Sequence, residues 1–219
     1  MASGALWEGS ILNRVIEGAQ ANGARPGRRG GRPAATSHAQ LAHVALELFA
    51  DRGFEATTVD DIAGAARIGR RTFFRYFSSK NDVVWGDFDA ELRRMREFLA
   101  ARAGDEPYLT SLRLAVLDFN TFAPAETPWH RRRIALILTV PALQAHSTLR
   151  YAAWRDVVAH HAAGRLGVPP DSALPRAIAY ALLGVCVAAY EQWLADEHAD
   201  LLPLLDANLR LLENGFRPE

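Results

Sequence analysis

The stretch ARIGRRTFFRYFSSKNDVV, residues 66–84, places arginines directly beside aromatic rings. The mixture is densest at Arg70, Arg71, Phe73, Phe74, Arg75, Tyr76 and Phe77. A helix buried on all sides would exclude the guanidinium groups, and a helix surrounded by water would gain nothing from so many rings. A helix with two different faces accommodates both kinds of residue.

Helical spacing separates the rings from the cations. Phe73 and Phe77 lie four residues apart and share one face, which we expect to pack into a core, while Arg70, Arg71 and Arg75 project elsewhere. Arginine pairs bidentately with guanine, which contributes about 1–3 kcal/mol of discrimination per contact. The outer face therefore favours a nucleic-acid partner over the alternative, an ordinary solvated arginine face.

Two more helices are predicted upstream of this segment. The first begins near Thr36 or Ser37 and stops at Gly53, because glycine tolerates the backbone conformation of a helix end. The second begins at Thr58, and Asp61 three residues later completes a variant of the capping box. Strand signals are nearly absent, so we expect an all-α protein.

A third helix from about Gly69 to Tyr76 completes a helix-turn-helix arrangement. The last helix of such a motif lies in the DNA major groove, and hydroxyl or ammonium groups at helix ends suit phosphates. The predicted DNA contacts of the motif are Thr58, Arg70, Arg71, Thr72, Phe74, Arg75, Tyr76 and Lys80.

Charge is segregated along a chain whose formal net charge is +0. Residues 25–80 carry ten Lys+Arg and five Asp+Glu, and the remainder carries fifteen and twenty. The segment ARPGRRGGRP, residues 24–33, cannot build a packed element and is typical of a flexible basic arm. Its arginines Arg28, Arg29 and Arg32 are predicted to enter a minor groove, although a plain disordered leader would look similar.

Residues 37–85, SHAQLAHVALELFADRGFEATTVDDIAGAARIGRRTFFRYFSSKNDVVW, resemble the DNA-binding domain of the TetR family of regulators. The resemblance rests on LFADRGFEATTVDDIA and on TFFRYFSSK. It implies a TetR-like, all-α homodimer with a C-terminal ligand domain, usually a repressor that leaves its palindromic double-stranded operator when a small molecule binds. Arg71 and Arg75 depart from the residue types common at their places, so no operator sequence can be carried over.

A narrower resemblance extends to residues 73–100, FFRYFSSKNDVVWGDFDAELRRMREFLA. This stretch is similar to the regulators found beside mycofactocin biosynthesis genes in actinobacteria. Regulators of that group look like sensors of long-chain acyl-CoA. The resemblance therefore implies an acyl-CoA as the small hydrophobic effector, and no tightly bound cofactor.

We expect three regions: a flexible basic N-terminal extension at 1–35, the helix-turn-helix domain at 36–82, and a ligand-binding and dimerisation domain at 83–219. After Ser78 or Ser79 one long helix is predicted, with an apolar stripe at Val84, Phe88, Leu92, Met95 and Leu99. Further helices are expected at roughly 107–122, 130–139, 142–166, 172–198 and 200–214.

The last two helices are the predicted dimer seam. Leucines recur there at alternating steps of three and four, as in a coiled coil, and small residues on the preceding helix allow close approach. The predicted interface residues are Leu202, Leu205, Leu209, Leu212, Ala181 and Gly184. The alternative is a stripe that packs inside one subunit.

Aromatic residues and arginines of the C-terminal region supply the candidate ligand pocket, since pockets are mostly apolar with a few polar groups. The candidates are Trp85, Phe88, Phe119, Phe122, Trp129, Arg150, Trp154 and Tyr180. Aromatic residues at helical spacing also build ordinary cores, so packing without a ligand is the alternative for each of them.

Other classes of function find less support. Asp156 and His160 stand four residues apart, but no second ligand pair has convincing metal spacing, so we expect neither a metal site nor an enzyme. An architectural DNA-binding protein without an effector remains open. A lone cysteine, Cys186, and a longest apolar run of only residues 177–190 predict a cytoplasmic protein without a membrane span.

Overall fold

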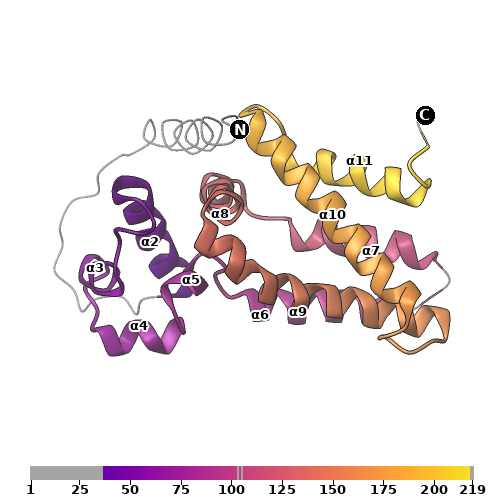
Figure 1. Ribbon diagram of the computed structural model, residues 1–219, viewed down its shortest axis with the longest axis horizontal. Coiled ribbons are helices and arrows are strands. Elements are labelled where there is room, and N and C mark those ends of the chain that lie inside the picture. Colours follow the sequence, from indigo (N-terminus) through magenta and orange to yellow (C-terminus); the bar gives the residue numbers. More distant parts are fainter. Residues whose placement is uncertain (1–36, 103, 105, 218–219) are drawn as a thin grey trace. The chain divides into compact units, whose positions relative to one another are not determined.

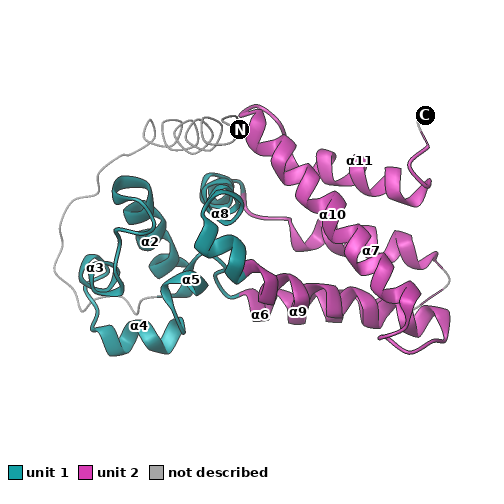
Figure 2. Cartoon of the chain, in the orientation of Figure 1, with its two compact units in different colours: residues 1–87, 124–146 teal, residues 88–123, 147–219 magenta. Residues whose placement is uncertain are grey.

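The computed structural model describes residues 37–102, 104 and 106–217. Within these ranges the secondary structure is helical, with no strand, which confirms the all-α prediction (Figure 1). The described part divides into two compact units, one of residues 37–87 with 124–146 and the other of 88–123 with 147–217 (Figure 2). The predicted arm with Arg28, Arg29 and Arg32 lies outside the described residues.

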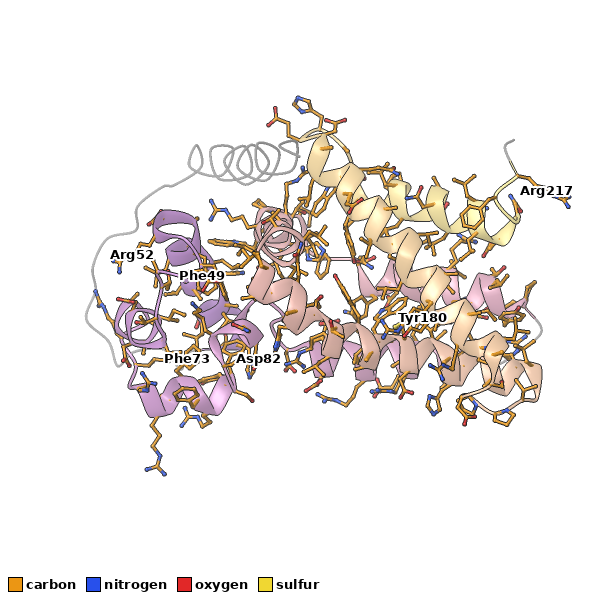
Figure 3. All side chains as sticks on the ribbon, in the orientation of Figure 1. Phe49, Arg52, Phe73, Asp82, Tyr180 and Arg217 are labelled. Atoms are coloured by element: carbon orange, nitrogen blue, oxygen red, sulfur yellow. The ribbon has the colours of Figure 1, made fainter. Side chains whose placement is uncertain are left out.

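Helices α2 (His38–Arg52), α3 (Val59–Ala65) and α4 (Arg70–Tyr76) begin the first unit. Ser37 caps α2 and Thr58 caps α3, each through a complete capping box, as the sequence predicts for Thr58. Each of the three helices contributes a fully buried side chain, Phe49, Ile62 and Phe73. Figure 3 labels Phe49 on α2 and Phe73 on α4. The inward face predicted for the quoted stretch is therefore confirmed.

The single long helix predicted after Ser79 is instead two helices, α5 (Lys80–Val83) and α6 (Phe88–Ala101). The backbone turns at Gly86, whose φ of 58° lies in the left-handed region that glycine adopts most readily. An isolated glycine inside a helical pattern is tolerated often enough that the sequence alone does not reveal this break. The buried stripe of α6 is as predicted at Leu92, Met95 and Leu99.

The first unit also contains η1 (Pro124–Glu126), α8 (Thr127–Thr139) and the first turns of α9 (Pro141–Leu166). His43 on α2 pairs with Glu126 at 3.0 Å and stacks on the Trp129 ring, with 4.3 Å between centroids. These contacts group residues 124–146 with the helix-turn-helix, whereas the sequence-based boundary places them in the C-terminal region.

The second unit consists of α6, α7 (Tyr108–Phe119), the rest of α9, α10 (Ala173–Ala195) and α11 (Leu201–Glu213). Helix α7 packs against α6 and α11, and α10 packs against α11. Arg113 ties α7 to α11 through ion pairs with Asp206 and Glu213. Burial acts to raise the pKa of Asp206, but hydrogen bonds from Arg210 and Arg113 outweigh it and lower that pKa.

Helix α10 is longer than the apolar run read from the sequence. By length and composition alone this one helix could cross a membrane, among the residues that the structure describes. Only 28% of its most apolar window is buried within the chain. A second apolar surface must cover the rest if the helix stays in water.

Candidate nucleic-acid interface and effector core

The outer face of α4 carries the predicted base-reading side chains. Arg71 and Arg75 are exposed, and the ring of Phe74 is 44% exposed beside them. Phe73 and Phe77 point the other way and are buried. A seven-residue helix with guanidinium groups and a ring on its open side can enter a major groove without unfolding anything beneath it.

Arg70 is engaged by an acidic residue of the neighbouring helix. Its Nη1 lies 2.8 Å from Asp60 Oδ2, and its Cζ lies 5.4 Å from the centroid of the Phe74 ring. The arginine and aspartate side chains are 58% and 68% exposed. Pairs this open to water are worth about 0–1 kcal/mol, so the pair does not withdraw Arg70 from DNA.

Two predicted phosphate contacts, the exposed Thr58 and the half-buried Lys80, also have structural roles. The Thr58 hydroxyl donates to Asp61 Oδ2 at 2.5 Å and accepts from the Asp61 N–H, and the Thr58 hydrogen bonds lower the pKa of Asp61. Lys80 Nζ donates to the Phe54 carbonyl at 2.7 Å and lies 4.2 Å from the Phe54 ring centroid. Both residues hold the motif together, which the sequence indicated for the Thr58 cap but not for Lys80.

The remaining predicted contacts lie at the same end of the unit. Thr72 is half-buried, and the half-buried Tyr76 meets the His38 ring edge-on while the Arg75 guanidinium lies 5.4 Å from its centroid. Sequence reasoning missed Arg67, an exposed cation in the turn between α3 and α4. Its position in the turn of the helix-turn-helix, within residues 66–84, could have identified it as a candidate.

The structure brings together three of the predicted ligand residues in the second unit. The rings of Phe88 and Phe119 meet edge to face at 6.0 Å, and the Arg150 guanidinium lies 5.8 Å from the Phe88 centroid. Arg150 also pairs with Asp89 at 3.5 Å. These residues form an aromatic and cationic group that a chain with a charged head could use.

The other predicted ligand residues are scattered. Trp154 is buried, Phe122 is half-buried, and Tyr180 is 56% exposed on α10 with the Arg155 guanidinium 4.2 Å from its ring centroid (Figure 3). Trp85 and Trp129 belong to the first unit. For Trp129, stacked on His43, packing between helices is the role that the structure shows.

A buried polar cluster in the second unit was missed by sequence reasoning. Tyr190 donates to Asn120 Oδ1 at 2.5 Å, and Tyr151 and Cys186 lie close enough to influence it. Burial raises the pKa of Cys186 and of Tyr151 to about 12 and that of Tyr190 well above its usual value. The two tyrosines and the cysteine are therefore neutral near pH 7.

The predicted dimer stripe is split by the fold. Leu205 and Leu209 are fully covered within the chain, as the internal-core alternative requires, whereas Leu202 and Leu212 are half-buried. Ala181 is half-buried and Gly184 is exposed. Apolar residues remain exposed on α10 and α11, at Leu174, Ala177, Tyr180, Gly184 and Leu211, and at Phe216 just after α11.

Asp156 and His160 lie on the exposed side of α9. His160 Nδ1 is 3.3 Å from Asp156 Oδ1 and 2.8 Å from the Asp156 carbonyl, an arrangement local to one helical turn. They line an open groove of about 470 Å³ with Arg155, Arg176 and Tyr180. The described residues contain no group of three metal-ligating side chains.

Two family models match the chain, one over the helix-turn-helix and the other over a C-terminal stretch that includes residues 124–146 of the first unit. Residues 41–84 match the model for bacterial regulatory proteins of the tetR family, and residues 106–217 match the MftR C-terminal domain. The chain belongs to the TetR family of bacterial transcriptional regulators. It is also 44% identical over 188 residues to the Mycobacterium tuberculosis protein named as the mycofactocin biosynthesis transcriptional regulator MftR, covering 86% of this chain and 95% of that protein.

Solved TetR-family structures share the fold. The fatty acid degradation regulator FadR of Bacillus halodurans superposes with a TM-score of 0.58 at 17% identity, covering 88% of this chain and 100% of that chain. Thermus thermophilus FadR, solved in complex with lauroyl-CoA, gives a TM-score of 0.55 at 24% identity and covers 83% and 96%. TetR regulators bind DNA operators and small molecules, typically as dimers, and are not enzymes.

Proposed function

We propose that this TetR-family protein is a homodimeric repressor that binds a palindromic operator through α4 and releases it when a hydrophobic effector, a long-chain acyl-CoA, occupies the second unit. The observation that carries the proposal is the two-faced α4, with buried Phe73 and exposed Phe74, Arg71 and Arg75. Two such helices about 34 Å apart fit successive major grooves, which is why a dimer is needed.

The effector proposal is supported by chemistry and by similarity. An acyl chain needs an apolar lining, and its phosphorylated head needs cations, which Phe88, Phe119 and Arg150 supply together. A FadR with the same fold was solved in complex with lauroyl-CoA, which supports the same ligand class.

Release needs only a modest difference in binding. A 100-fold loss of operator affinity corresponds to about 2.7 kcal/mol, within the usual range of coupling between two sites. The dimer has one geometry in which the two α4 helices fit DNA and another in which they do not. The effector must therefore bind the second geometry about 100-fold more tightly than the first. No chemical step is required of the protein.

One experiment tests DNA binding and release together. Random duplex DNA is selected with the full-length protein, and the enriched sequence is footprinted with and without acyl-CoAs of increasing chain length. We expect a palindromic footprint that long chains remove and short chains leave in place. Enrichment without any acyl-CoA response would favour the effector-independent DNA-binding protein, and no enrichment would overturn the repressor proposal.

A further inference from the structure

Arg70 is held on two sides by residues of two helices. Its Nη1 donates to Asp60 Oδ2 on α3 at 2.8 Å, and its guanidinium carbon lies 5.4 Å from the centroid of the Phe74 ring on α4. A long side chain on an open surface otherwise samples many rotamers, and fixing one costs free energy at the moment of binding. These two contacts restrict the side chain before DNA arrives.

The two supports are exposed side chains on helices that the core holds in place. Phe74 meets the buried ring of Phe73 edge-on, with centroids 5.4 Å apart and an interplanar angle of 89°. Asp60 lies in the first turn of α3, where the capping box between Thr58 and Asp61 sets the helix start. The position of the Arg70 guanidinium is thereby linked to the core of the helix-turn-helix.

We propose that Asp60 is a positioning residue for base recognition: it orients Arg70 so that the remaining guanidinium N–H groups face a guanine edge in the major groove. A guanidinium has five N–H donors, and Asp60 occupies one of them. A bidentate contact to guanine O6 and N7 needs two. The proposal rests on the proposed function, because it specifies how that DNA interface selects its sequence.

The charge of Asp60 gives the proposal a distinctive signature. A carboxylate on a surface that meets phosphates is repulsive toward every DNA sequence, so its removal strengthens sequence-independent binding. The same removal frees Arg70 to take other rotamers and weakens the preference for guanine. Substitution of a residue that served only stability would not strengthen sequence-independent binding and at the same time weaken the preference for guanine.

The test uses the full-length protein and the duplex that it selects from random DNA. Affinities are measured for that duplex, for duplexes with each base pair replaced symmetrically in both half-sites, and for a scrambled duplex. For Asp60→Asn we expect discrimination at one guanine position per half-site to fall about threefold to fivefold, which is as much as a pair this exposed supports, with equal or tighter binding to scrambled DNA. Arg70→Ala should lose discrimination at that same position.

Two further variants separate positioning from charge. Glu55, an exposed carboxylate between α2 and α3 with no ion pair among the described residues, provides the control Glu55→Gln. It should shift selected and scrambled DNA by the same factor. In an Arg70→Ala background, Asp60→Asn should produce no further loss of discrimination.

The outcomes distinguish the inference from the function on which it rests. Wild-type discrimination at every position in Asp60→Asn, or an undiminished effect of Asp60→Asn in the Arg70→Ala background, would overturn the positioning role while leaving the repressor intact. Failure of the wild-type protein to select any sequence would overturn both. Thermal unfolding of each variant checks that the exposed substitutions leave the fold unchanged.

Discussion

Arg67 holds a backbone conformation that usually belongs to glycine. Its φ is 55°, and the turn around it closes the end of α3 through hydrogen bonds from Arg67 N–H to the Gly64 carbonyl and from Ile68 N–H to the Ala63 carbonyl. A side chain with a Cβ pays about 1–2 kcal/mol in this region. The turn of the helix-turn-helix therefore stores strain at one residue.

Replacing Arg67 by glycine should stabilise the protein. Arg67→Gly removes the clash of the Cβ, although the freer unfolded chain offsets part of the gain, so we expect the free energy of unfolding to rise by about 0.5–1 kcal/mol. Urea unfolding measures it. Arg67→Ala is the control, because it removes the charge and keeps the Cβ; an equal gain in both variants would contradict the backbone explanation.

His130 on α8 should make stability depend on pH. Burial, and secondarily the charge of Arg133, lowers its pKa from 6.5 to about 3. The histidine takes up a proton near pH 6.5 in the unfolded chain, but only near pH 3 in the folded chain. The stability of the folded protein that depends on the neutral histidine is therefore complete above pH 6.5 and declines as the pH falls from 6.5 toward 3. Between pH 7.5 and 5 the loss is about 2 kcal/mol.

Unfolding of the wild type and of His130→Gln at those two pH values checks the His130 contribution. The glutamine cannot titrate, so the variant should show a smaller loss on acidification, whatever its stability at pH 7.5. All other titrating groups contribute to the pH dependence of both proteins, so the difference between the two reports on His130. An identical pH dependence in the two proteins would show that the histidine is not kept neutral by burial.

At the scale of the element, α9 is anchored to the short helix α5. His146 Nε2 lies 2.9 Å from Asp82 Oδ1, and Asp82 also accepts a hydrogen bond from the Ser79 hydroxyl at 2.8 Å (Figure 3). His146 belongs to the first unit and the next residue of the same helix belongs to the second. The contact therefore lies inside the first unit and fixes the first turns of α9 to α5.

We expect His146→Leu to lower the free energy of unfolding by about 1–3 kcal/mol, because a largely buried carboxylate loses a hydrogen-bonding partner. His146→Gln, which retains a donor, should lose less. Chemical unfolding measures both, and operator release curves show whether the leucine variant needs more effector. Equal stability of the two variants and the wild type would contradict a role for the pair.

The elements were predictable from sequence where their causes are local. The caps at Ser37 and Thr58 and the ring spacing of Phe73 and Phe77 act within a few residues, and the structure has them as expected. At Gly86 a helix could either continue through the glycine or end there, and tertiary packing decides between the two. Local patterns carry no such information.

The site was predictable only in part, because its decisive contacts join distant residues. Asp60 and Arg70 are ten residues apart, and Asn120 and Tyr190 are seventy apart, so no spacing rule reveals either pair. The leucine stripe of α11 shows a second limit of sequence reasoning. Its alternating spacing indicates a buried face, but it does not show whether the same chain or another chain covers that face. Leu205 packs inside this chain.

At the scale of the whole molecule, the open apolar surface of α10 and α11 is the remaining candidate for the dimer interface. Helix α10 exposes Leu174 and Gly184, and α11 exposes Leu211. Small residues let two helices approach closely, and a partner that covers this surface would remove apolar area from water. The same contact would set the separation of the two α4 helices on DNA.

Gly184 allows that interface to be tested without disturbing the subunit. A Cβ built at Gly184 meets no atom within 4 Å, and the same holds for Gly164 on α9. Gly184→Glu should therefore fold, yet place a charge where a partner must pack, so light scattering should give the mass of one chain. Operator affinity should fall about 100-fold or more, because two half-sites no longer bind as one unit. The control Gly164→Glu adds the same charge to an exposed position of α9 outside this surface, and it should stay dimeric. If Gly184→Glu were dimeric and bound the operator with wild-type affinity, the interface would lie elsewhere.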